Sequence, residues 1–233
     1  MCRACLAQPR PLAAEYFCAS CQTPFLNAAP LDEKGQCAFC RLGIPGFDSV
    51  YTYGSYEDSL RTLIHLFKYE KITPLAKPLG NLLALAIPRQ KQFDVIVPMP
   101  LHWRKRWARG FNQSEILAKE IARRWGVPVR SVVKRTKATA PQAGLTNAKR
   151  RLNVRGAFSV SGNRKLKGLR VLLIDDVLTT GATASACAAA LKRAGAVHVS
   201  VAAVARTDRR IGLEEFRYRE TAPLAVAARS QTV

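Results

Sequence analysis

Short apolar runs alternate along this chain with amphipathic segments. Buried strands are predicted at residues 47–54, 93–97, 171–174 and 197–205. An apolar stripe at helical spacing, formed by Leu60, Leu63, Ile64 and Phe67, predicts a helix over 59–69. Further helices are expected at 75–87, between Pro74 and Pro88, at 114–125, and from about Ala182 onward. Strands that alternate with helices indicate an α/β fold with a parallel sheet.

The strand predicted at 171–174 runs directly into two carboxylates, Asp175 and Asp176. A small, hydroxyl-rich turn follows, made of Thr179, Thr180, Gly181, Ala182 and Thr183. Adjacent carboxylates can accept hydrogen bonds from the two hydroxyls of a ribose, and a turn that opens a helix offers N–H groups to a phosphate. We therefore expect a site for a 5-phosphorylated ribose. The alternative is an ordinary strand–turn–helix with an acidic loop.

A second candidate site segment follows the strand at 93–97, which ends in the turn Pro98, Met99 and Pro100. Such a turn is expected to expose backbone N–H groups beside the basic run 103–109. We expect Pro98, Met99, Pro100 and Arg109 to bind pyrophosphate, at the edge where open α/β sheets bind ligands. The stretch 135–157 is polar and lacks periodicity, so it is expected to be a lid loop with three candidate residues, Gln142, Arg151 and Asn153.

Six of the seven cysteines form three Cys-x-x-Cys pairs, each with the spacing of a zinc knuckle. Two such pairs complete a tetrahedral Cys₄ site. The favoured set is Cys18, Cys21, Cys37 and Cys40, and the alternative joins Cys2 and Cys5 to the 18/21 pair. Pro, Gly and polar residues dominate 24–46, so we expect Zn²⁺ to be structural and to supply folding free energy.

The charge of the chain favours an anionic partner. Its 233 residues carry 37 Lys and Arg against 16 Asp and Glu, a net charge of +21. Residues 101–155 hold fifteen of the basic residues, only two acidic ones, and all three tryptophans. Phosphate contacts and base stacking would suit single-stranded DNA, with Trp103, Arg104, Lys105 and Arg106 as candidate contacts. The alternative is a solvated basic surface.

The apolar runs are too short to span a bilayer, and Cys2, Arg3 and Cys5 interrupt any signal segment at the start. We therefore expect a cytoplasmic protein that does not insert into a membrane.

Several motifs occur in a specific order: the cysteine knuckles, Phe67-Lys68-Tyr69, Val97-Pro98-Met99-Pro100, Arg109-Gly110-Phe111-Asn112-Gln113, the 142/151/153 loop, and 174–183. In this combination residues 2–206 resemble the ComF family. The resemblance implies a type I phosphoribosyltransferase fold, a parallel sheet flanked by helices, with a small N-terminal zinc ribbon. It divides the chain into a zinc ribbon at 1–46, a phosphoribosyltransferase-like domain at 47–207 and a flexible tail at 208–233. Many members carry four cysteine pairs, whereas this chain has three.

The resemblance also implies a ligand and a role. The expected ligands are PRPP and Mg²⁺, with Asp175 and Asp176 as the catalytic residues of a phosphoribosyltransferase, a glycosyltransferase that transfers a pentosyl group. The expected role is in DNA uptake during natural competence, or in the use of external DNA, together with a helicase-like ComF partner. The alternative is a non-catalytic module of the uptake machinery that binds single-stranded DNA or uses its zinc ribbon to recruit partners.

Overall fold

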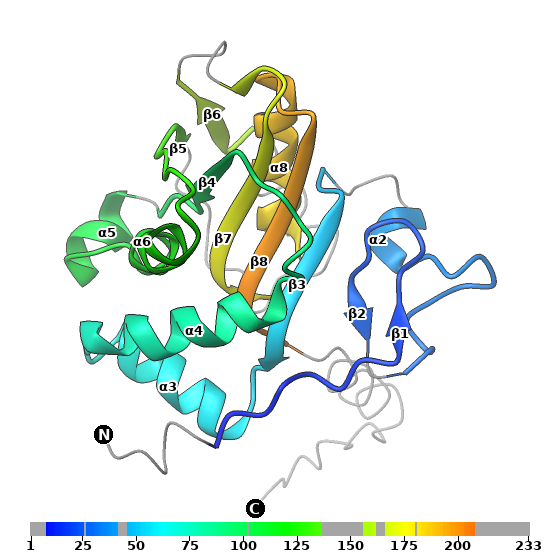
Figure 1. Ribbon diagram of the computed structural model, residues 1–233, viewed down its shortest axis with the longest axis horizontal. Helices are drawn as coiled ribbons and strands as arrows, with labels where there is room; N and C mark the ends of the chain where they lie inside the picture. The colour runs from blue at the N-terminus through cyan, green and yellow to red at the C-terminus, as the bar shows by residue number, and fades with distance from the viewer. Residues whose placement is uncertain are drawn as a thin grey trace, which may run out of the picture.

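The computed structural model describes residues 8–25, 27–41, 46–101, 103–136, 156–161, 166–179 and 181–207. Its central sheet has the strand order β3-β8-β7-β4, and every neighbouring pair is parallel. The four strands, side by side in Figure 1, are β3 (Ser49–Ser55), β4 (Val95–Pro98), β7 (Arg170–Leu178) and β8 (His198–Arg206). Because the strands are parallel, their carboxyl ends all meet at one edge of the sheet.

Helices cover both faces of this sheet (Figure 1), with α3 (Asp58–Lys68), α4 (Ala76–Ala86) and α6 (Gln113–Trp125) on one face and α8 (Ala182–Arg193) on the other. Along β7, Leu172 and Ile174 join the first helical layer, while Val171 and Leu173 join the second. Burial on both faces explains why this strand is a continuous apolar run in the sequence. The stripe predicted for 59–69 is confirmed, since its four members are all buried in α3.

The strand that carries the two acidic residues is longer than predicted. We expected it to end at Ile174, but β7 continues to Leu178, and Asp175 and Asp176 lie within it. The extension follows from β8, which still pairs with β7 at Leu178. On the other side, β4 stops pairing at Ile174. The two acidic residues therefore have a strand on one side only, and the opposite side is open.

Some short elements were not predicted. These are the 3₁₀ turn η1 (Thr73–Leu75), the basic helix α5 (Trp103–Arg109), and the antiparallel strands β5 (Val133–Arg135) and β6 (Phe158–Val160). Strands of three residues are too short to show a period, so only their pairing with each other defines them.

The cysteine-rich segment consists of the hairpin β1 (Tyr16–Phe17) and β2 (Pro24–Phe25), followed by α2 (Ala38–Arg41). It packs beside the sheet through Arg206, a buried residue at the end of β8. Arg206 donates a hydrogen bond to the carbonyl of Pro24, and its guanidinium lies 4.7 Å from the ring centroid of Phe25. This contact joins the hairpin to the strand that neighbours the acidic pair.

Several expectations fall on residues outside the described ranges: Cys2, Cys5, Thr180, Gln142, Arg151, Asn153 and the tail 208–233. Within the described part of the chain, no helix is long and apolar enough to cross a membrane.

The crossing of α4 and α6 yields a test of the packing. A Cβ atom at Gly80 would lie 2.8 Å from the Cβ of Glu120, closer than such atoms approach in proteins. We expect Gly80→Ala to lower the free energy of unfolding by ~1–2 kcal/mol, although alanine favours helices, because overpacking outweighs propensity. Chemical denaturation measures the change. In a Glu120→Gly background the same substitution should be neutral or stabilising, and a stabilising effect in the wild type would contradict the close approach.

Candidate functional site

A cavity of about 250 Å³ opens at the carboxyl edge of the sheet, where β7 extends beyond β4. Its lining comes from the ends of α3, β4 and β7 and from the starts of α6 and α8, and includes Lys68, Met99, Pro100, Arg109, Gln113, Ser114, Arg135, Asp175, Asp176, Thr179, Gly181 and Thr183. The structure thus brings together the acidic pair, the predicted phosphate turn and the Pro-x-Pro turn.

Asp176 is buried, and a donor reaches each of its carboxylate oxygens. The Lys68 ammonium lies 2.8 Å from Oδ1, and the Gln113 side-chain amide donates to Oδ2 at 3.0 Å. Burial opposes the charge on Lys68, but attraction and hydrogen bonding to Asp176 outweigh it and raise the pKa of the ammonium. Lys68 therefore keeps its proton and compensates one of the two adjacent carboxylates.

Asp175 is held less tightly. Its Oδ1 accepts hydrogen bonds from the Ser114 hydroxyl at 3.2 Å and from the Asp176 backbone N–H at 2.9 Å. Among the described residues, no hydrogen bond reaches Oδ2. Burial and the neighbouring charge of Asp176 raise the pKa of Asp175 to about 7, although the two hydrogen bonds and Lys68 oppose the shift. Near neutral pH this carboxyl group can thus either donate or accept a hydrogen bond.

The start of α6 positions these donors. Asn112 caps the helix, since its side-chain oxygen accepts from the Ser114 backbone N–H at 3.2 Å. The same side chain donates to the carbonyl of Met99 at 3.0 Å, which fixes α6 to the turn after β4. Gln113 and Ser114 follow the cap directly, so one buried asparagine orients both contacts to the acidic pair.

The predicted phosphate turn lines the same cavity. Thr179, Gly181 and Thr183 line it, and α8 begins at Ala182. Gly181 has φ +77°, a left-handed conformation that glycine adopts without strain. The amino end of α8 supplies a partial positive charge and N–H donors of the kind that bind phosphate.

The Pro-x-Pro turn lines the cavity through Met99 and Pro100. The prediction that residues 98–100 expose backbone N–H groups to a ligand is wrong. Proline has no N–H, and the N–H of Met99 donates to the carbonyl of Ile174 at 2.8 Å, which continues the sheet. Two arginines nevertheless line the same cavity. Arg109 lines the cavity with its guanidinium 5.0 Å from the ring centroid of Tyr69, and Arg135 lines it as well.

Sequence reasoning assigned no role to Lys68, Gln113, Ser114 or Arg135. Lys68 and Gln113 lie within two of the motifs, 67–69 and 109–113, but nothing in the sequence around them indicated a role in the site. Lys68 ends α3, where a lysine usually compensates the helix dipole. Burial lowers the pKa of Arg135, and the charge of Asp175 opposes that shift. A partly buried cation of this kind is recognisable only once the acidic residue near it is known.

Four cysteines form a separate cluster in the N-terminal segment. The sulfur atoms of Cys18, Cys21, Cys37 and Cys40 all lie within 4.8 Å of one another, so they could hold a metal such as zinc. The separations are 3.5 Å for Cys18–Cys40, 3.8 Å for Cys21–Cys37 and 3.7 Å for Cys37–Cys40. Tetrahedral zinc with bonds of about 2.3 Å would place its sulfurs roughly 3.8 Å apart. The structure therefore groups the 18/21 pair with the 37/40 pair.

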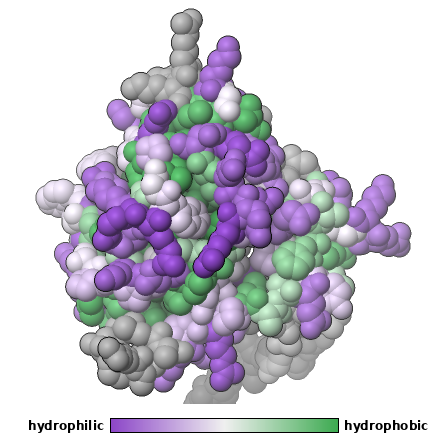
Figure 2. All heavy atoms as spheres, in the orientation of Figure 1, coloured by the Kyte–Doolittle hydropathy of each residue, from purple (hydrophilic) through white to green (hydrophobic). Residues whose placement is uncertain are grey.

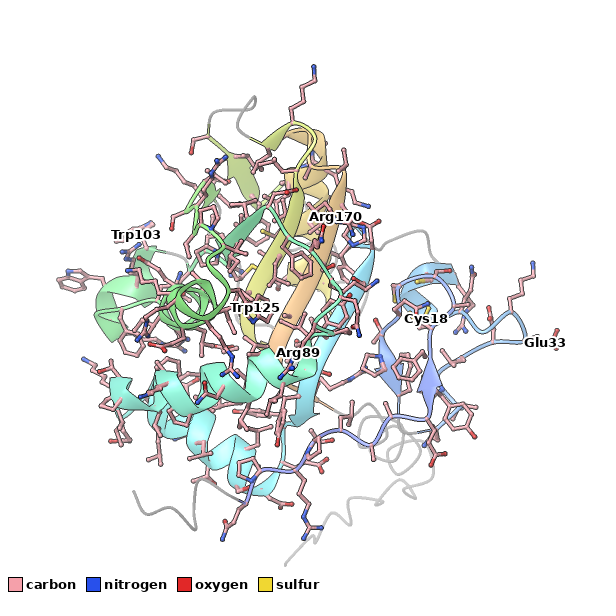
Figure 3. The ribbon with its side chains drawn as sticks, in the orientation of Figure 1. Cys18, Glu33, Arg89, Trp103, Trp125 and Arg170 are labelled. Carbon is pink, nitrogen blue, oxygen red and sulfur yellow. The ribbon has the colours of Figure 1, made fainter. Side chains whose placement is uncertain are left out.

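The predicted nucleic-acid contacts lie on α5. The side chain of Trp103 is 65% exposed and projects from the outer edge of the molecule in Figure 3, while Trp107 is 88% exposed. Arg106 is exposed and lies 3.6 Å from Glu115 of α6. The side chains of Arg104 and Lys105 fall outside the described set. Two large aromatic groups in solvent beside a basic side chain form a surface on which bases could stack.

Comparison with known proteins places these features in context. Residues 112–222 match the phosphoribosyl transferase domain. Competence protein F of Haemophilus influenzae is 33% identical over 178 residues, which cover 73% of this chain and 78% of that protein. The DNA utilization protein YhgH of Escherichia coli K12 is also 33% identical, over 181 residues with the same coverage. Competence protein ComFC of Bacillus subtilis is 30% identical over 139 residues, 58% of this chain and 53% of its own.

Among solved structures, the glutamine phosphoribosylpyrophosphate amidotransferase of B. subtilis, complexed with ADP and GMP, aligns with a TM-score of 0.38 at 24% identity. The alignment covers 54% of this chain and 25% of that enzyme. The family assignment depends instead on the curated relatives, whose length this chain largely spans. With a phosphoribosyltransferase domain and a cluster of four cysteines beside it, the chain belongs to the ComF family, which includes competence protein F, ComFC and YhgH.

Proposed function

We propose that this protein binds PRPP, or a related 5-phosphorylated ribose, in the cavity at the carboxyl edge of the sheet and transfers the phosphoribosyl group to an acceptor. The observation that carries the proposal is that a single cavity is lined both by the carboxylates of β7 and by the turn that opens α8, with its hydroxyls and backbone N–H groups. A ribose with a 5-phosphate presents hydroxyls and an anion in this same combination.

Each group has a role in the proposed complex. Asp175 and Asp176 accept hydrogen bonds from the 2′ and 3′ hydroxyls, and the turn from Thr179 to Thr183 receives the 5-phosphate. Arg109 and Arg135, which also line the cavity, would pair with the pyrophosphate. Mg²⁺ would accompany the pyrophosphate, whose oxygens are the ligands that it prefers.

Transfer would break the bond between C1 of the ribose and the pyrophosphate oxygen and form a bond from C1 to the acceptor. The pyrophosphate leaves with the bonding electrons, and the sugar passes through an oxocarbenium-like state. The carboxylates stabilise the positive charge that develops on the sugar, and the arginines stabilise the leaving group. Catalysis in this scheme is mostly positioning, which a rigid strand and a capped helix provide.

The biological setting of the proposal comes from the relatives, two of which are named for competence and one for DNA utilization. We propose that this protein acts in the cytoplasm on DNA taken up from outside, together with a helicase-like partner. A phosphoribosyl acceptor or a nucleotide product would then derive from the incoming DNA.

Calorimetry with PRPP and Mg²⁺ tests the cavity directly. Asp176→Asn removes the charge that pairs with Lys68 and the acceptor offered to a ribose hydroxyl. We expect PRPP to bind at least tenfold more weakly to this variant, as for a lost charge-assisted hydrogen bond. The matched control is Glu57→Gln, which removes one exposed carboxylate that does not line the cavity and should leave the affinity unchanged. Equal affinity of wild type and Asp176→Asn would refute the assignment.

Release of pyrophosphate in the presence of nucleobases, ammonia or DNA fragments then tests turnover.

We further propose that the metal held by Cys18, Cys21, Cys37 and Cys40 is a structural Zn²⁺. The sulfur separations fit its tetrahedral geometry, and the backbone N–H of Cys37 donates to the sulfur of Cys18 at 3.3 Å, as expected next to a thiolate ligand. The hairpin and the four-residue helix α2 are too small to fold on hydrophobic burial alone, so the metal would supply the missing free energy.

Metal analysis of the reduced protein should find one zinc per chain. Cys37→Ser should lose most of this zinc and lower the melting temperature, because three ligands hold the metal much more weakly. Cys187→Ser serves as the control, since Cys187 is buried in α8, away from the cluster, and should retain full zinc. A Cys37→Ser variant with undiminished zinc would exclude the four-cysteine site. Two zinc ions per chain would show that Cys2 and Cys5 bind metal too.

A second candidate function is the binding of single-stranded DNA by α5. Trp103 and Trp107 are the observation that favours it, since both side chains are largely exposed and an aromatic ring in solvent offers a face on which a base can stack. Arg109, the last residue of this helix, lines the cavity, so a strand stacked on the tryptophans would pass the mouth of the site.

Anisotropy with a labelled oligonucleotide tests this surface. Replacing both Trp103 and Trp107 with alanine should weaken binding by ~10-fold or more, since base stacking contributes about 1–3 kcal/mol per base. Binding by the wild type should also fall steeply as salt increases. Phe17→Ala removes an exposed aromatic residue from the cysteine-rich hairpin and is the control. If the double variant and the wild type bind alike, α5 is not the contact surface.

A further inference from the structure

A second, larger cavity lies away from the phosphoribosyltransferase site. It is a groove of about 720 Å³ between the ends of α4 and α6 and the connection 87–94 that leads to the amino end of β4. The first cavity lies at the carboxyl edge of the same sheet, so the two sites are separated by the length of the strands. The volume is typical of small-molecule sites, which span roughly 300–1,000 Å³.

The groove combines an apolar floor with a cationic rim. Phe93 and Trp125 form the floor, the exposed Leu85 adds an apolar edge, and Arg89, Lys91 and Arg124 line the rim. Figure 2 shows hydrophilic side chains on both sides of a paler strip in the middle of this face, and Figure 3 places Arg89 next to Trp125 there.

The rim cations are largely uncompensated. Among the described residues neither Arg89 nor Lys91 has an ion-pair partner, and the Arg124 guanidinium donates to the neutral amide oxygen of Asn81 at 2.9 Å. The only carboxylate in the described lining belongs to Asp94, which accepts a hydrogen bond from the Arg170 backbone N–H at 2.7 Å. The groove thus carries a net positive charge and suits an anion.

Helix dipoles explain only part of this charge. Arg124 stands in the last turn of α6, where a cation is stabilising in any helix. Arg89 and Lys91 lie beyond the end of α4, in the connection, and do not cap it. Trp125 is only half-buried and leaves part of its ring in the groove. A free anion would use the cations but not the indole, whereas a planar anionic ligand would use both.

We propose that this groove is a nucleotide-binding site, in which a base stacks on Trp125 and its phosphate pairs with Arg89, Lys91 and Arg124. Stacking on an aromatic ring beside arginine is a general way to bind a base. The ligand can be a free nucleotide or one unit of a single strand, because both present the same base and phosphate. The inference is independent of PRPP binding, since the groove shares no residue with the first cavity.

The three tryptophans allow a direct measurement. Trp103 and Trp107 are exposed, so replacing both with phenylalanine leaves Trp125 as the only tryptophan with little effect on packing. Deoxyadenosine monophosphate should quench the fluorescence of Trp125 in a saturable manner. Deoxyadenosine without phosphate, or inorganic phosphate without a base, should bind at least tenfold more weakly. An oligonucleotide arm distinguishes the two sources, since tighter binding of the oligonucleotide would identify a strand, and equal or weaker binding a free nucleotide.

In the same single-tryptophan protein, Arg89→Gln combined with Lys91→Gln should weaken nucleotide binding by ~10-fold or more. The matched control is Arg123→Gln, which removes a cation from the same turn of α6 as Arg124. Arg123 pairs with Glu120 and does not line the groove, so its loss should have no effect. Absence of quenching by both mononucleotide and oligonucleotide would overturn the proposal. Undiminished binding in the double variant, or equal quenching by polyglutamate, would overturn it too.

Discussion

The side chains of Asp175 and Asp176 project from consecutive residues of a buried strand, and two like charges in this position require compensation. Lys68 and Gln113 provide it for Asp176, and Ser114 and a backbone N–H provide it for Asp175. The side-chain donors come from α3 and α6, so the end of α3 and the start of α6 must both dock at the carboxyl edge of the sheet. The raised pKa of Asp175 shows that the compensation is incomplete. An incompletely compensated carboxyl group beside a cavity is available to a ligand.

The parallel sheet places the acidic pair, whose charge needs compensation, beside the other groups that line the cavity. Because all four strands run in the same direction, the end of β4, the acidic pair on β7 and the start of α8 meet at one edge. The early end of β4 opens the side of β7 that would otherwise be paired. Asn112 then fixes α6 to the turn after β4 by bonding Met99 with one end of its amide and capping the helix with the other. The early end of β4, the Asn112 cap of α6 and the turn that opens α8 together define the cavity.

The opposite edge of the sheet has a different character. There the connection into β4 brings Arg89 and Lys91 to the ends of α4 and α6, where Trp125 is only half-buried. In the proposed complexes, the cavity at one edge, the groove at the other and the exposed tryptophans on α5 would each receive a nucleotide or its phosphate. Such ligands would account for the large positive charge of the chain, because basic side chains lie at each of the three places.

The sequence by itself determined the helices and strands with strong periodicity, the acidic pair with its phosphate turn, and the cysteine pairs, because each is encoded within a few neighbouring residues. It failed where the decisive partner is remote. The end of β7 depends on β8, the N–H of Met99 is used by Ile174, and Lys68 meets Asp176 only in the folded chain. The choice between cysteine pairs and the existence of the groove beside Trp125 were also decided by tertiary structure. Local patterns fix which side chains a segment offers, whereas packing fixes which of them remain available to a ligand.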